Sequence, residues 1–284
     1  MTTLSCEGIR EAAGIKDIVL PDHLYLGQRY DKWGNQILKN GTRLPGELFQ
    51  DESVQKILKQ GNVLSDFITK VKYARTYHLP WSPGKTRDDR QMENVEIFEG
   101  KRVIITEKRD GENTTIYNDN PPHARSLDSE NDPSIKWVKN FWAQHFAYQQ
   151  KIPDGWRICG ENLYIRHSIP YNDLDTYFEA FSIWDDRNVC LDWDTTVEWA
   201  ELLDLKLVPV IYDGIWDMGV IDSLNKIFKL GYDKMEGYVV RVADEFHYSQ
   251  FRKYVGKYVR SNHVHQHGKS VHIKMDRYRT NSLK

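Results

Sequence analysis

The chain of 284 residues contains only three cysteines, and they lie far apart in the sequence. Cys6, Cys159 and Cys190 form no Cys-x-x-Cys pair, so neither a disulfide framework nor a structural zinc site of the usual spacing is expected. No stretch is long and apolar enough to span a membrane, and the N-terminus MTTLSCEGIR lacks the apolar segment of a signal peptide. These absences predict a soluble, intracellular protein of the cytoplasm with reduced thiols and no membrane partner.

A large excess of charge of one sign is also missing. The 39 basic and 41 acidic residues leave a net charge of −2, which does not attract nucleic acid to the molecule as a whole. Any binding to nucleic acid must therefore come from a local basic patch. Hydrophobic residues make up 40% of the chain, enough for one large domain, alone or with a small appendage.

The pattern of apolar residues predicts an α+β domain in which antiparallel sheets are flanked by helices. Runs of β-branched or aromatic residues predict strands over residues 101–106, 114–117, 156–159, 177–184 and 237–242. Helical spacing of apolar residues predicts helices over residues 134–149, 195–203 and 221–229.

Composition divides the chain into three parts. Residues 1–70 are rich in loops and glycine and read as an N-terminal extension of unknown role, residues 71–262 as the main domain, and residues 263–284 as a basic C-terminal tail. In the tail, basic residues far outnumber acidic ones, which is typical of a phosphate-binding patch but also of a solvated tail. A metal site at His263, His265 and His267 is disfavoured because no cysteine or second ligand cluster supports it.

The segment TEKRDGEN, residues 106–113, places a Lys-x-Asp-Gly motif directly after a predicted strand. Taken alone, this motif also fits a surface hairpin turn at Asp110-Gly111, with Lys108 solvated. Further segments make the turn a poor explanation. They are HARSLDS from His123, GENLY from Gly160, YFEAFSIW from Tyr177, EGYVVR from Glu236 and KYVGKYVR from Lys253.

In this order, these segments resemble the motifs of the covalent nucleotidyltransferase superfamily, which contains DNA ligases, RNA ligases and mRNA-capping enzymes. The resemblance covers roughly residues 72–264 and is greatest to the RNA ligases of phages and bacteria. It implies the nucleotidyltransferase domain of an ATP-grasp-like ligase fold. It also implies that Lys108 is the catalytic nucleophile and that Glu161 and Glu236 bind the metal.

The resemblance further assigns a set of nucleotide-binding residues: Thr106, Glu107, Lys108, Asn113, Arg125, Glu161, Phe178, Glu236, Lys253 and Lys257. Phe178 best matches the aromatic residue that stacks on adenine, with Phe181 second. The chain departs from the family at the last motif, where Lys253 and Lys257 stand four residues apart instead of two. Lys257 is favoured over Lys253 and Arg260 as the phosphate contact. Ser182 replaces an aspartate that often follows the aromatic motif, which we interpret as a change of packing or polarity.

The chemistry explains why such a site needs basic residues and a metal. A free lysine has a pKa of about 10.4, so an amine that attacks phosphorus must first be made neutral by nearby cations and partial desolvation. Bound Mg²⁺, together with Lys253, Lys257 and Arg125, is a suitable source of positive charge. The same cations offset the charge that builds up on the phosphate oxygens in the transition state.

The resemblance therefore predicts an ATP-dependent RNA ligase that requires ATP and Mg²⁺, with Mn²⁺ able to substitute. Its partner is RNA with 5′-phosphate and 3′-hydroxyl ends, and no obligate protein partner is expected. The same motifs also fit an ATP-dependent DNA nick ligase or a GTP-dependent capping enzyme. A non-catalytic RNA-binding protein is disfavoured because Lys108, Glu161 and Glu236 are all present.

Overall fold

A computed structural model describes residues 36–37, 43–44, 70–126, 133–261 and 280–284. Most of the N-terminal extension and of the basic tail, including its histidines, lies outside these residues, so the domain boundaries remain predictions. In the described part of the chain, no helix is both long and apolar enough to cross a lipid bilayer.

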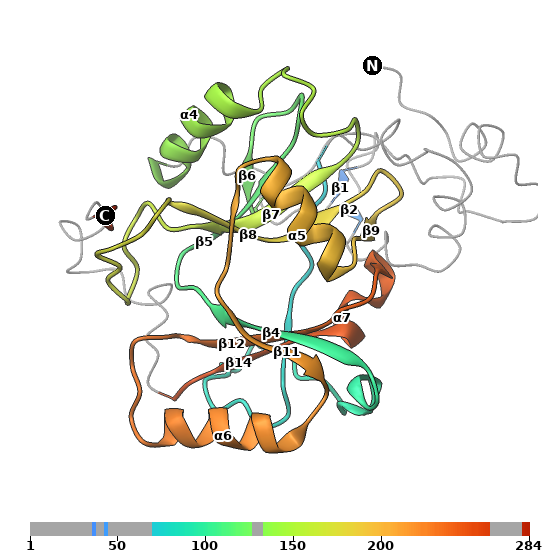
Figure 1. The fold of residues 1–284 in the computed structure, drawn as a ribbon, viewed down its shortest axis with the longest axis vertical. Coiled ribbons are helices and arrows are strands. Elements are labelled where there is room, and N and C mark those ends of the chain that lie inside the picture. The colour runs from blue at the N-terminus through green and yellow to red at the C-terminus, as the bar shows by residue number, and fades with distance from the viewer. Residues whose placement is uncertain (1–35, 38–42, 45–69, 127–132, 262–279) are drawn as a thin grey trace, which may run out of the picture.

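The domain is built on two mainly antiparallel sheets, which confirms the predicted α+β class (Figure 1). One sheet has the strand order β11 (Val210–Ile215), β4 (Arg102–Lys108), β12 (Gly237–Val242), β14 (Val255–Val259) and β3 (Tyr77–His78). The other has the order β13 (Phe246–His247), β9 (Val189–Cys190), β8 (Phe178–Trp184), β7 (Arg157–Asn162), β5 (Glu112–Ile116) and β6 (His123–Ala124), with β10 (Lys206–Leu207) paired to β8. A separate pair of short strands joins β1 (Gln36–Ile37) to β2 (Arg43–Leu44).

The helices lie where the sequence places them, with shifted ends. Helix α4 (Lys136–His145) follows a 3₁₀ turn at Pro133–Ile135, and α5 (Trp193–Leu202) and α6 (Met218–Lys229) each begin earlier than predicted. The reason is capping: the carboxylates of Asp192 and Asp217 accept hydrogen bonds from the backbone amides of Thr195 and Gly219, 2.9 and 2.7 Å away. Shorter helical elements are η2 (Glu96–Phe98), η5 (Tyr248–Gln250) and α7 (Phe251–Tyr254).

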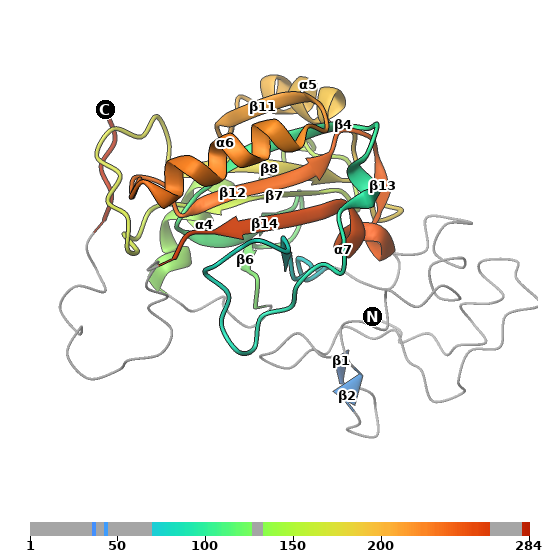
Figure 2. The same ribbon diagram turned by 90° about the horizontal axis from the view of Figure 1, so that it is seen from below.

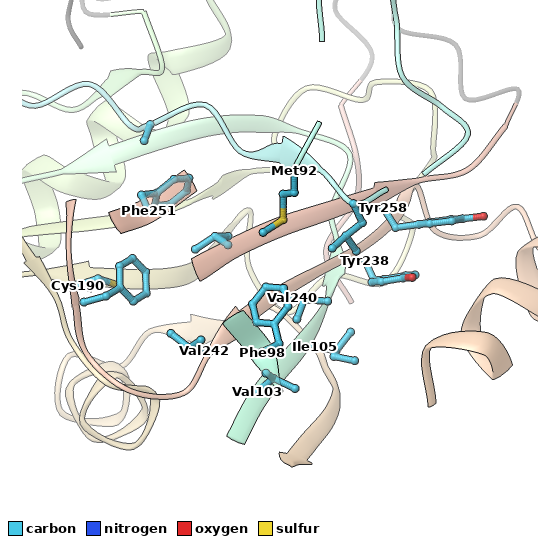
Figure 3. Packing of buried hydrophobic residues seen from close by; sticks show 14 of the residues in the cluster. Met92, Phe98, Val103, Ile105, Cys190, Tyr238, Val240, Val242, Phe251 and Tyr258 are labelled. Atoms are coloured by element: carbon cyan, nitrogen blue, oxygen red, sulfur yellow. The ribbon is translucent and has the colours of Figure 1, made fainter. Parts of the chain in front are cut away.

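Each sheet is covered on one face by apolar packing. Helix α6 lies along the five-stranded sheet (Figure 2), where Phe228 stacks near the rings of Tyr238 and Tyr258. These residues belong to a large buried cluster in which Val103, Ile105 and Val240 also lie (Figure 3). A second cluster packs α4 and α5 against the seven-stranded sheet. Because side chains alternate along a strand, Thr106 and Lys108 of β4 lie on the face of the five-stranded sheet opposite Val103 and Ile105.

The chain crosses from one sheet to the other in the turn between β4 and β5. Gly111 lies in this turn, and a Cβ atom there would come within 2.5 Å of the carbonyl oxygen of Asn162. Only glycine therefore fits this close approach. The turn brings the end of β4, where Lys108 lies, beside the seven-stranded sheet.

Candidate active site

Lys108 lies at the end of β4, at the point where the chain leaves the five-stranded sheet. Its Nζ donates a hydrogen bond to the carboxylate of Glu236, which directly precedes β12 and is only 3% exposed on its side chain. Pairing of Gly237 with Lys108 in the β12–β4 ladder sets this contact. A second carboxylate, that of Glu161 on β7, accepts a hydrogen bond of 3.1 Å from the backbone amide of Gly111. Two acidic residues from different sheets are thus gathered around one lysine.

The electrostatics of this group do not favour two ionised carboxylates beside one lysine. Burial opposes the charge of Lys108, but Glu236 and Glu161 favour it more strongly, so the pKa of Lys108 lies above its ordinary value. Burial raises the pKa of Glu161 to about 8, opposed by the lowering influence of Lys108 and reinforced by the nearby Glu236. Lys108 alone therefore does not keep both carboxylates ionised at neutral pH, and added positive charge would favour the ionised form of Glu161.

The acidic pair fits a magnesium ion. No group of three or more histidine, cysteine, aspartate or glutamate side chains among the described residues could hold a metal by itself. Mg²⁺, however, usually keeps several waters and uses one or two carboxylates together with substrate phosphates. Glu161 and Glu236, brought together beside Lys108, match that donor set.

Of the three cations considered for the phosphate, only Lys257 is brought close to Lys108. It lies on β14 opposite Val239, which in turn pairs with Thr106 of β4, so all three side chains share one face of the sheet. Burial and the nearby Lys108 lower the pKa of Lys257 to about 8. Its Nζ lies 3.8 Å from a carboxylate oxygen of Asp89.

Lys253 and Arg260 lie elsewhere. Lys253 is an exposed residue of the short helix α7, which ends before β14 begins. The Nε of Arg260 donates a hydrogen bond of 3.0 Å to the carbonyl of Met235. Lys253 therefore lies on a helix and Lys257 on the strand that follows, so the two lysines do not form a pair on one strand.

Two further predicted residues carry polar atoms without a partner in the described part of the chain. They are Oδ1 of Asn113, on β5 opposite Glu161, and Nε of Arg125, just after β6. Burial and the nearby Arg75 lower the pKa of Arg125. A partly buried guanidinium with a second one nearby is a suitable site for an anion. Thr106 is buried beside Lys108, whereas the carboxylate of Glu107 is 2.9 Å from Nη1 of Arg109.

The expectation that Phe178 stacks on a base is not supported by the structure. Its side chain is fully buried on the helix-covered face of the sheet, where its ring centroid lies 6.1 Å from that of Phe141. Phe181, the second candidate, is half-buried and packs against the other cluster, with its ring edge-to-face with Tyr73. The reason is the alternation of side chains along β8: Phe178 and Phe181 are three residues apart and so lie on opposite faces of the strand.

Sequence patterns missed an ionic cluster beside the nucleophile. Arg109, the variable residue of the Lys-x-Asp-Gly motif, donates hydrogen bonds of 2.6 and 2.9 Å to the carboxylate of Glu179 on β8. Its guanidinium also lies 4.8 Å from the ring centre of Tyr171. No local signal links these residues, because they are distant in the sequence and meet only through the fold.

Comparison with known proteins identifies the family of the chain. A family model described as RNA ligase matches residues 101–259. No curated protein matches the chain.

Among solved structures, an archaeal ATP-dependent RNA ligase is 14% identical, with a TM-score of 0.45, over 67% of this chain and 48% of that one. A Naegleria gruberi RNA ligase variant with ATP and Mn is 18% identical, with a TM-score of 0.41, over 58% and 51%. A putative ATP-dependent DNA ligase from Aquifex aeolicus is 18% identical, with a TM-score of 0.43, over 67% and 50%. The chain thus spans about half the length of these proteins.

Proposed function

Because this chain belongs to the RNA ligase family, we propose that it is an ATP-dependent RNA ligase that works through a covalent Lys108–AMP intermediate. The observation that carries the proposal is the contact of Lys108 with Glu236 beside Glu161 and Lys257. A nucleophile, two metal-binding carboxylates and a phosphate-binding cation are then in one place. This arrangement suits successive displacements at phosphorus.

In the first step, the neutral amine of Lys108 attacks the α-phosphorus of ATP. A nitrogen–phosphorus bond forms, the bond to the bridging oxygen breaks, pyrophosphate leaves and the nitrogen gives up a proton. Before ATP binds, Glu236 accepts a hydrogen bond from Lys108 and so aims its nitrogen. Glu161 and Glu236 would hold Mg²⁺, which would supply positive charge that favours the neutral amine and stabilises the phosphate oxygens.

The next two steps use the same residues. An oxygen of a 5′-phosphate attacks the lysyl-AMP phosphorus, Lys108 leaves as an amine that takes up a proton, and a 5′-5′ pyrophosphate linkage forms. A 3′-hydroxyl then attacks the 5′-phosphorus, a phosphodiester forms and AMP leaves. Lys257 and Arg125 are the cations placed to bind phosphate oxygens, and Asn113 offers its side-chain amide to the nucleotide or the 5′-phosphate. Thr106 and Glu107 line the nucleotide beside the nucleophile. Lys253, exposed on α7, lies outside this group of residues.

Phe181, and not Phe178, is the ring of β8 that we propose for stacking on the adenine. Replacing Phe181 by alanine should weaken ATP binding by roughly 5- to 100-fold, because a lost base–aromatic stack costs about 1–3 kcal/mol. ATP affinity measured by calorimetry tests this. Phe178→Leu is the matched control: it alters the buried side of the same strand and should leave the affinity unchanged. Equal losses in both variants would remove Phe181 from the base site.

The pKa of Lys257 predicts how ATP binding depends on pH. In the free protein this pKa is lowered to about 8, and a bound phosphate raises it because the charged form is then paired. Affinity for a non-hydrolysable ATP analogue should therefore be constant below about pH 8 and fall by up to about tenfold per pH unit above it. Lys257→Arg should flatten the fall, since arginine stays protonated. The same decline in both proteins would exclude Lys257 as its source.

The activity is tested by incubating the protein with Mg²⁺ and α-labelled ATP or, in parallel, α-labelled GTP, followed by a denaturing gel. Acid-labile label from ATP supports a ligase, and transfer to 5′-phosphorylated RNA or DNA then distinguishes the two substrates. Label from GTP alone would replace the proposal with a capping enzyme. No label from either, with protein confirmed to be folded and free of bound AMP, would favour a non-catalytic RNA-binding protein.

A further inference from the structure

The loop formed by residues 163–177, between β7 and β8, has a small core of its own. Its buried members are Leu163, Ile169, Tyr171 and Leu174, with Tyr177 packed against them. The loop lies against the turn that follows Lys108. A loop with its own core can serve as a rigid support.

One side of this support holds Asp110, which is only 6% exposed. Its Oδ2 accepts hydrogen bonds from the backbone amides of Ser168 and Ile169, both at 2.8 Å, and from the hydroxyl of Ser168 at 2.6 Å. A buried carboxylate with three donors is fixed in position. The second residue after the nucleophile therefore depends on the conformation of the 163–177 loop.

Tyr171 of the same loop holds Arg109 and the backbone of the turn. Its hydroxyl accepts a hydrogen bond of 3.0 Å from the amide of Asp110, and its ring lies under the guanidinium of Arg109. Arg109 is also held by its two hydrogen bonds to the carboxylate of Glu179. Both residues that follow Lys108 are thus held by side chains outside β4.

The 163–177 loop is itself closed by a segment from the other end of the chain, residues 280–284 (Figures 1 and 2). Asn281 is 3% exposed; its Oδ1 accepts from the amide of Tyr171 at 2.9 Å, and its Nδ2 donates to the carbonyl of Leu163 at 2.7 Å. Its backbone amide donates to Tyr164, and its carbonyl accepts from the hydroxyl of Tyr177. One residue therefore joins the beginning, middle and end of the loop.

Main-chain hydrogen bonds also join residues 282–284 to Leu174 and Tyr171 of the loop. The amide of Leu174 donates to the carbonyl of Ser282, and the amide of Lys284 donates to the carbonyl of Leu174, at 3.1 and 3.0 Å. The amide of Ser282 donates to Tyr171 at 3.1 Å. Residues 280–284 thus supply hydrogen-bond donors and acceptors for backbone groups of the 163–177 loop.

We infer that Asn281 is a positioning residue for the nucleophile, acting through the 163–177 loop on the turn at Asp110 and thereby on Lys108. The inference rests on the proposed function of Lys108. A displacement of about 1 Å at a reacting group can cost about 100-fold in rate. Formation of lysyl-AMP should be the sensitive step, because it alone requires Lys108 to attack.

The test compares Asn281→Ala with Ser282→Ala in the full chain. Ser282 is the matched control because it is exposed and, among the residues that the structure describes, its hydroxyl bonds only to the carbonyl of Asn172. Asn281→Ala is expected to label with ATP at least about tenfold more slowly, while it seals pre-adenylated RNA at nearly the rate of the unaltered protein. Unchanged labelling, or an equal loss in both steps as from mere destabilisation, would overturn the inference.

Hydrogen exchange gives a second readout that does not need activity. In Asn281→Ala, the backbone amides of Ser168 and Ile169 should exchange faster than in Ser282→Ala, because the loop that presents them to Asp110 is loosened. Equal exchange in the two variants would overturn the inference. If the unaltered protein forms no adduct with ATP, the proposed function fails, and the exchange result alone decides whether Asn281 holds the turn.

Discussion

Lys108→Arg is expected to form no covalent nucleotide adduct while the protein remains folded. Arginine keeps a cation opposite Glu236, but its guanidinium stays protonated and cannot attack phosphorus. Lys108→Ala should also lose the adduct, but it leaves the buried Glu236 without its cation and should lose about 1–3 kcal/mol of stability. The arginine variant is therefore the cleaner test, read from label retained on a denaturing gel.

Both Lys108 variants should still seal RNA that already carries a 5′-5′ AMP, because the third step does not use the lysine as nucleophile. This result would show that the fold and the remaining site are intact. Label retained by Lys108→Arg would place the nucleophile on another residue. Failure of the third step in that variant would show that Lys108 has a role beyond carrying AMP.

Glu236→Gln is expected to reduce lysyl-AMP formation by about 100-fold and to require more Mg²⁺ for half-maximal rate. Glutamine keeps the shape of the side chain and can still accept a hydrogen bond from Lys108, but it removes a negative charge. Two effects then oppose each other. Lys108 loses the main influence that raises its pKa and becomes easier to deprotonate, while the metal loses one of two carboxylates. We expect the loss of metal support to prevail, since positive charge near the α-phosphate acts on the transition state itself.

The measurement is the initial rate of adduct formation over a range of Mg²⁺ concentrations. Glu161→Gln should behave in the same direction, whereas Glu198→Gln, an exposed change on α5, serves as the control. A Mg²⁺ dependence in Glu236→Gln that matches the unaltered protein would remove Glu236 from the metal site. It would leave Glu236 only the role of orienting the lysine.

Local patterns in the sequence were sufficient for the strands that carry the motifs. The run GYVVRV was predicted as a strand and forms β12 with the same ends, because Tyr238, Val240 and Val242 alternate into one buried cluster and its β-branched residues favour extended backbone. Helix ends were less well predicted. The caps at Asp192 and Asp217 extend α5 and α6 toward the N-terminus, and α4 ends early, before Tyr148 and Gln150 adopt positive φ angles of 57° and 52°.

Apolar patterns and motifs were enough to predict the α+β class and which residue types could act at the site, since Lys108, Glu161 and Glu236 lie in motifs that are continuous in the chain. Which side chains meet follows from the packing of the two sheets, which such local patterns do not encode. Phe178 and Phe181 lie on opposite faces of β8 because they are three residues apart, and the packing of helices on the face of Phe178 leaves Phe181 on the face toward the other sheet. The support of the Lys108 turn by Asn281 likewise depends on hydrogen bonds between segments more than a hundred residues apart, and no local pattern of residues encodes such pairs.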